Sequence, residues 1–184
     1  MIWIILIFLA IILFAVIACY NSLVASKMKV ENSWSQIDVQ LQRRFDLIPN
    51  FVETVKGYMN HESETFEKIT ALRTSWANAS TVKDKAEIDN QISGALKTIM
   101  AVSENYPELK ASQNFTNLSE ELKNTENKIS FSRQFYNDSV TRYNTKVQTF
   151  PSNIIAGMFG FTAKDLFAVE NQDARQNVKV DFSK

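Results

Sequence analysis

The side chains best suited to chemistry are two carboxylates, one imidazole and two guanidinium groups in the first half of the chain. They are Asp38, Arg44, His61, Glu62 and Arg73. If the chain folds back at Pro49, Asp38 comes level with His61 and Glu62. A carboxylate beside an imidazole can orient a general base. The spacing therefore allows an enzyme or a small-ligand receptor.

A structural role explains the same five residues with fewer assumptions. No nucleophile, phosphate-binding loop or second metal ligand accompanies them in the sequence. Glu62 and Arg73 stand on an apolar helical stripe, where a charged side chain is expected to be paired when it is buried. We therefore expect a polar network that fixes helix register. Neither enzymatic activity nor a cofactor is predicted.

Composition excludes several other kinds of site. The chain has one cysteine, Cys19, and one histidine, His61, which are too few for a Cys/His zinc site or an internal disulfide. Twenty basic and twenty acidic residues cancel, so no nucleic-acid partner is expected. Arg43 and Arg44 suit phosphate. However, the turn expected at Pro49 lies about 40 Å from the membrane segment described next, too far for lipids of the same membrane.

Residues 1–19 are apolar throughout and read MIWIILIFLAIILFAVIAC. At ~1.5 Å of rise per residue, such a helix spans just under the ~30 Å hydrocarbon core of a bilayer. We expect a transmembrane anchor, with aromatic side chains at both interfacial zones. Its marker residues are Trp3, Phe8, Phe14, Cys19 and Tyr20.

Two alternatives concern how the anchor is processed and oriented. Residues 16–19 (VIAC) resemble a lipobox, which would make Cys19 an acylated first residue, but no basic residue precedes Lys27. We prefer an uncleaved span. Because basic residues follow the span and none precedes it, the positive-inside bias favours an outside N-terminus and a cytoplasmic domain.

The rest of the chain is predicted to be helical. Only four glycines and three prolines occur, and apolar residues recur every three or four positions. The first helix is expected to continue from the anchor and either to turn back or to kink at Pro49. Four helices with short connections predict an all-α fold, an up-down-up-down bundle in residues 20–150. The apolar stripes cover residues 30–48, 52–76, 88–102 and 118–147.

Residues 151–184 form a third region, because the order of helices returns Phe150 to the membrane-proximal end. Its apolar side chains are expected to pack under the bundle, enter the membrane interface or join subunits. Residues 170–184 are expected to be an extended tail that needs a docking surface. The candidate contact residues are Ile154, Ile155, Met158, Phe159, Phe161 and Phe167.

A pair of asparagines is also notable on the last long helix. Asn137 and Asn144 each follow a tyrosine and are seven positions apart, so they share one helix face. Their amides could bond across helices or to a neighbouring subunit, and the sequence leaves both alternatives open.

Several segments, taken in order, resemble the signature of the LemA family. They are residues 34–44 (WSQIDVQLQRR), 46–50 (DLIPN), 53–58 (ETVKGY), 133–137 (RQFYN), 150–156 (FPSNIIA) and 178–182 (VKVDF). The resemblance implies a bacterial protein with one N-terminal span, a long helical bundle and no established enzymatic activity. Some family members are lipoproteins with a cysteine before the Tyr-Asn pair, as at Cys19. A magnetosome-associated branch is linked to internal membrane compartments.

Two functions therefore stand out from the sequence. The first is a membrane-anchored scaffold in the bacterial cell membrane that binds lipids, forms homo-oligomers and organises or remodels membrane. The second is a monomeric tethered adaptor that docks an unidentified protein partner in envelope stress or signalling.

Overall fold

The computed structural model describes residues 1–59 and 63–167. Within these ranges all regular structure is helical, which confirms the predicted all-α fold class. The expected positions of His61, Glu62 and the tail at 170–184 lie outside the described residues. The helices are α1 (Ile2–Lys56), α2 (Ser63–Asn78), α3 (Val82–Ser103), α4 (Pro107–Ala111), α5 (Gln113–Gln148) and α6 (Ser152–Met158).

Helix α1 runs for 55 residues from the apolar anchor into the bundle and includes Pro49. The turn considered at Pro49 is therefore wrong, since the helix ends only at Lys56. A proline inside a helix costs about 3 kcal/mol. Ile48, Phe51 and Val52 are buried around it, and burying each such side chain contributes roughly 1.5–3 kcal/mol. Their combined burial outweighs the lost backbone hydrogen bond.

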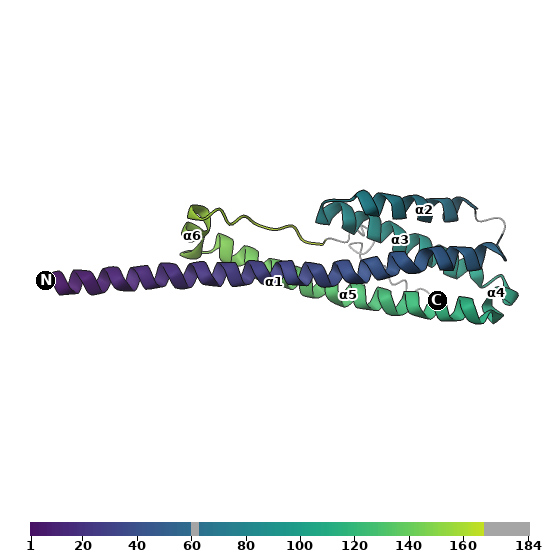
Figure 1. Ribbon diagram of the computed structural model, residues 1–184, viewed down its shortest axis with the longest axis horizontal. Helices are drawn as coiled ribbons and strands as arrows, with labels where there is room; N and C mark the ends of the chain where they lie inside the picture. Colours follow the sequence, from purple (N-terminus) through teal and green to yellow (C-terminus); the bar gives the residue numbers. More distant parts are fainter. Residues whose placement is uncertain (60–62, 168–184) are drawn as a thin grey trace, which may run out of the picture.

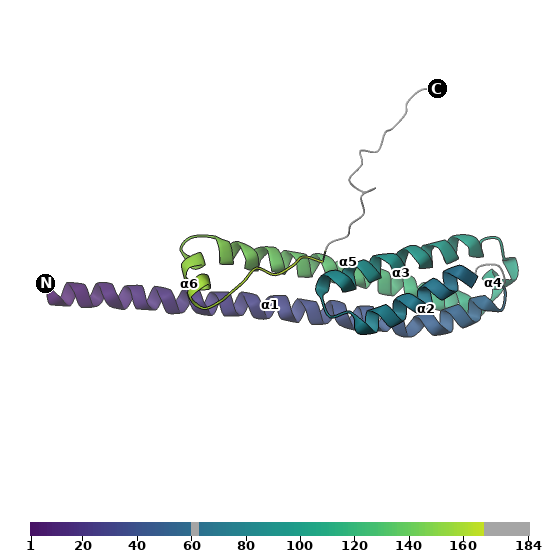
Figure 2. The ribbon, with the colours of Figure 1, turned by 90° about the horizontal axis from the view of Figure 1, so that it is seen from above.

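Long helices that follow one another in the chain lie antiparallel. In Figure 1, α1 extends along the whole molecule and α5 returns beside it, while α2 and α3 cover only the half farthest from the N-terminus. Figure 2 shows α6 at the other end of α5, next to α1. The order of α1, α2, α3 and α5 is consistent with the predicted up-down-up-down bundle. The short α4 connects α3 to α5 at the far end.

Aromatic contacts fill the core where the helices cross. Phe45 of α1 stacks on Trp76 of α2 with ring centroids 4.5 Å apart. Phe51 of α1 stacks on Phe115 of α5 at 5.9 Å. Such pairs add about 0.5–1.5 kcal/mol beyond the burial of their area. They fix the register of α1 against both neighbours.

Candidate functional site

The first third of α1 extends beyond the bundle and exposes its apolar side chains. Trp3, Phe8 and Phe14 are 78%, 62% and 75% exposed. Among the described residues, α1 is the one helix long and apolar enough to cross a membrane, with a mean hydropathy of 3.3 in its best window. The N-terminal part of the chain is thus compatible with a single-pass anchor.

Helix α6 packs against the end of this apolar stretch. Ile155 and Ala156 form a small buried cluster with Leu23 of α1, flanked by Val16 and Cys19. The sequence placed six apolar residues in this region without separating their roles. In the structure Ile155 and Phe167 are buried and Phe161 is half-buried. Ile154, Met158 and Phe159 are exposed.

An aromatic group lies where the anchor enters the bundle. The Tyr20 ring centroid is 4.8 Å from that of Phe159 and 5.7 Å from that of Phe161. Helix α5 is hydrogen-bonded to α1 just beyond Tyr20. Lys146 Nζ donates to the hydroxyl of Ser22, at 2.8 Å, and to that of Ser26, at 2.7 Å. Tyr20 is therefore part of a junction between the anchor, α5 and the chain after α6.

Residues 159–167, here called the strap, leave α6 and run back along the bundle (Figure 2). Asn144 binds the strap backbone twice: its Nδ2 donates to the Lys164 carbonyl and its Oδ1 accepts from the Lys164 N–H, both at 2.8 Å. Asn137 makes the same two contacts with Phe167, at 3.2 and 2.8 Å. The two asparagines thus hold this chain's own backbone.

The tyrosines that precede these asparagines complete the attachment. The Tyr136 hydroxyl donates to the Asp165 carbonyl at 2.9 Å, and the Tyr143 hydroxyl donates to the Thr162 carbonyl at 3.0 Å. Burial, together with the negative charge of Asp165, raises the pKa of Tyr136 to about 12. Burial also raises the pKa of Tyr143. Both hydroxyls are therefore protonated donors at neutral pH.

The repeat along α5 matches the repeat along the strap. Seven helical residues advance about 10.5 Å, and three extended residues advance about 10 Å. Asn137 and Asn144 therefore meet Phe167 and Lys164, three residues apart, in antiparallel register. We refer to the two Tyr-Asn pairs as the ladder.

Farther from the N-terminal apolar stretch, a buried polar network joins three helices. Arg44 of α1 donates from Nη1 to Ser93 Oγ at 2.8 Å and to Glu126 Oε2 at 2.6 Å. Its Nη2 donates to the carboxylate of Asp89, which also accepts from Arg133. Arg44 and Asp89 are 0% exposed. Burial lowers the pKa of Arg133 below its ordinary value.

The other predicted network residues lie elsewhere. Asp38 accepts from Lys85 Nζ at 2.6 Å, at the edge of the bundle. Arg73 is exposed on α2, and Leu72 beside it is buried instead. The structure therefore brings neither Asp38 nor Arg73 to Arg44.

Sequence reasoning missed Asp89, Ser93, Glu126 and Arg133. Asp89 stands three residues before the buried Ile92, and so occupies a position on the apolar stripe of α3. That placement was the available signal, because a carboxylate on a buried stripe needs a cationic partner. Glu126 and Arg133 carried no comparable signal, since one is half-exposed and both belong to a polar helix.

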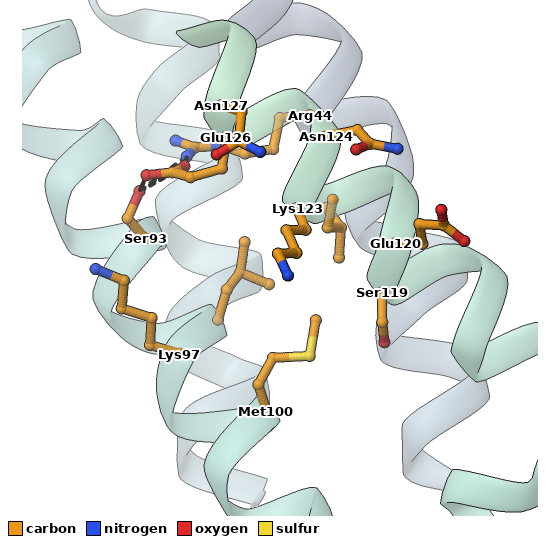
Figure 3. Close-up of a pocket in the computed structure, with 12 residues that line it drawn as sticks. Arg44, Ser93, Lys97, Met100, Ser119, Glu120, Lys123, Asn124, Glu126 and Asn127 are labelled. Atoms are coloured by element: carbon orange, nitrogen blue, oxygen red, sulfur yellow. Dashed lines mark hydrogen bonds and ion pairs between the residues drawn. The ribbon is translucent and has the colours of Figure 1, made fainter. Parts of the chain in front are cut away.

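A groove of about 720 Å³ lies between α3 and α5. Figure 3 shows Arg44 and Glu126 at one end of it and Met100 near the other. Lys97 and Lys123 flank it from opposite helices. The remaining apolar lining comes from Leu96 and Leu122. Glu120 and Glu126 line it as well, so the groove combines an apolar floor with sides that carry both charges.

Comparison with known proteins gives consistent matches. The model of the LemA family matches residues 33–182. Protein LemA of Metamycoplasma hominis is 33% identical over 141 residues, which cover 74% of this chain and 63% of that protein. Magnetosome proteins MamQ 1 and MamQ 2 of Paramagnetospirillum magneticum are each 23% identical, over 80% of this chain and 64% of theirs. The chain therefore spans less than two thirds of the length of these relatives.

Proposed function

Since this chain belongs to the LemA family, we propose that it is a non-enzymatic, membrane-anchored helical protein that self-associates into a scaffold organising or remodelling membrane. The observation that carries the proposal is the exposed apolar surface of α6 and of the residues on either side of it, beside the end of the anchor. It consists of Phe150, Ile154, Met158 and Phe159, which are 52–75% exposed.

The position of α6, at the end of the apolar stretch of α1, indicates what this surface can contact. Val16, Cys19 and Leu23 of α1 flank or contact α6, and they bracket the end of the apolar stretch. An apolar surface at that depth meets the membrane interface or a second copy anchored beside it. A single anchor helix does not need it. Two relatives are named as magnetosome proteins, which agrees with a role at membranes.

The polar side chains support a non-enzymatic role. The charges of Arg44, Asp89 and Glu126 are used in pairing helices with one another. Asp38, the candidate partner of an imidazole base, is bound to Lys85.

We further propose that the bundle lies on the cytoplasmic side, as the positive-inside bias favours. Acylation of Cys19 is the alternative form of attachment. The intact mass of the protein purified from membranes distinguishes an uncleaved span from a lipoprotein, because lipoprotein processing would remove residues 1–18 and add acyl groups.

Light scattering of the full-length chain in a mild detergent tests self-association. We expect a mass well above that of the monomer, and a lower mass for the triple variant Phe150→Ser, Ile154→Ser, Met158→Ser. The control is Val39→Ser with Phe131→Ser, which removes apolar side chains 63% and 74% exposed on other helices. Vesicles carrying each protein are imaged in parallel. A monomeric wild type that leaves vesicle shape unchanged would overturn the scaffold.

The groove between α3 and α5 favours one second candidate, a tethered adaptor. Its apolar floor, with charges of both signs along its sides, suits an amphipathic segment of a protein partner. Crosslinking in membranes separates the two functions: crosslinks to one other protein without self-crosslinks would support the adaptor, and self-crosslinks would support the scaffold.

A further inference from the structure

A second pocket, of about 360 Å³, lies between α1 and the strap at the membrane-facing end. Tyr20 and Lys27 of α1 line one side, and Phe159 and Lys164 line the other. Tyr143 of α5 also lines the pocket. It is therefore built from three parts of the chain that are distant in sequence.

The depth of this pocket follows from the helix that carries it. Tyr20 directly follows the apolar stretch, and Lys27 is seven residues farther on. At ~1.5 Å per residue, the pocket begins at the edge of the hydrocarbon and extends about 10 Å outward. The headgroup zone on each side of a bilayer is roughly 5–7 Å thick. Side chains on a helix lean toward its N-terminus, so Lys27 leans toward the membrane.

Lysines outnumber carboxylates at this level, where the carboxylates are Glu31 of α1 and Asp165 beside Lys164 on the strap. Lys27 and Lys164 line the pocket, and Lys146 lies at the same level, bound to the serine hydroxyls of α1. Glu31 is the carboxylate nearest to Lys27, at a loose 3.9 Å, with both side chains nearly half exposed. Such an exposed pair is weak and leaves the lysine able to bind another anion.

The ladder fixes the backbone that carries one of these cations. Both backbone groups of Lys164 are bound by Asn144, so the strap cannot slide along α5 without breaking two hydrogen bonds. Gly160, which also lines the pocket, has a φ of 71° and turns the chain from α6 into the strap. The attachment point of the Lys164 side chain is thus set by hydrogen bonds to its own backbone.

We propose that this pocket binds the phosphate headgroup of an anionic phospholipid from the membrane that holds the anchor. Lysines attract the phosphate, and the rings of Tyr20 and Phe159 lie at the level where aromatic side chains meet lipid headgroups and the upper acyl chains. The proposal rests on the proposed membrane anchoring through the N-terminal part of α1, but not on self-association.

The test uses the full-length chain, delipidated in an uncharged detergent. Its thermal unfolding temperature is followed while phosphatidylglycerol or phosphatidylcholine is added, because a ligand that binds the folded state raises that temperature. We expect phosphatidylglycerol to bind more tightly. The double variant Lys27→Gln, Lys164→Gln should lose about 30-fold in affinity, as each lysine near an anionic surface contributes roughly fivefold.

Three further variants keep the result interpretable. Lys97→Gln with Lys123→Gln makes the same charge change at the distant groove and should bind like wild type. Lys27→Arg with Lys164→Arg keeps the charge and should keep most of the affinity. Asn144→Ala keeps both lysines but frees the strap, and should weaken binding severalfold while circular dichroism shows the helices intact.

Two kinds of outcome would overturn the proposal, and a third would overturn only the scaffold. Equal affinity for both lipids, or equal losses in the two glutamine variants, would show diffuse attraction without a site. Stabilisation by inorganic phosphate as large as that by phosphatidylglycerol would assign the pocket to free phosphate. A monomeric protein that still prefers phosphatidylglycerol at these lysines would retire the scaffold and leave the lipid site standing.

Discussion

At the scale of single residues, the ladder shows how a side-chain amide can hold a backbone segment. An asparagine carries one acceptor and one donor group, which match the N–H and carbonyl of a peptide unit. Asn137 and Asn144 use this match at Phe167 and Lys164. Because the contacts are made to backbone atoms, the side chains of the strap do not reveal them in the sequence.

Replacing these asparagines tests the ladder one position at a time. Asn144→Ala should destabilise the protein by about 1–3 kcal/mol, since it leaves strap backbone groups without their partner. Amide hydrogen exchange should lose protection at Lys164, whereas Asn137→Ala should lose it at Phe167. Asn124→Ala, at an exposed position of α5, is the control and should change neither. Unchanged protection in both ladder variants would contradict the contacts.

At the scale of elements, the end of α6 directs the strap. Phe161 N–H donates to the Ala156 carbonyl at 2.9 Å, and Gly160 adopts a φ of 71°. This is the arrangement of a Schellman motif, which ends a helix with a left-handed residue. The strap then runs beside α1 and α5 over the half that α2 and α3 leave uncovered (Figure 2). One glycine thereby determines where a separate element lies.

Two glycine-to-alanine changes should have opposite signs. Gly160→Ala should lower the free energy of unfolding by about 1–2 kcal/mol, because an L-residue is strained at positive φ. Gly94→Ala, inside α3 and with nothing within 4 Å of the added Cβ, should raise it by about 0.5–1 kcal/mol. Urea unfolding of both variants measures the difference. A stabilising Gly160→Ala would show that the strap is not anchored through this turn.

At the scale of the whole molecule, the network around Arg44 joins α1, α3 and α5. A buried ion network contributes little net stability compared with apolar packing, but it is costly to break at one member. The network instead fixes the register of α3 and α5 against the long α1. The aromatic stack of Phe45 on Trp76 acts in the same part of the bundle.

Removing Arg44 should therefore be far more damaging than removing its neighbour. Arg44→Met should destabilise the folded state by roughly 3–5 kcal/mol, because the fully buried Asp89 loses one of its two cationic partners. Arg43→Met removes a half-exposed pair with Glu121 and should cost less than about 1 kcal/mol. Denaturant unfolding of the two variants side by side gives the comparison. Similar losses would mean that the buried network is not specific.

The sequence by itself determined the helical class, the apolar N-terminal helix and the family. Each depends on local information: apolar residues every three or four positions, an uninterrupted apolar stretch and short motifs in order. It also identified α6 as part of an apolar region, and Arg44 as a charged residue on a buried helix. These features do not depend on which helices pack against one another.

Only the tertiary structure decided which polar groups meet. Arg44 pairs with Asp89 and Glu126, not with Asp38 or Arg73, and Asn137 and Asn144 bind the strap. Burial of apolar side chains around Pro49 likewise allows α1 to continue through this proline to Lys56. The reason is physical: periodicity reports which face of a helix is buried, whereas pairing depends on the rotation and register of helices far apart in the chain. Packing across the whole molecule fixes those two quantities.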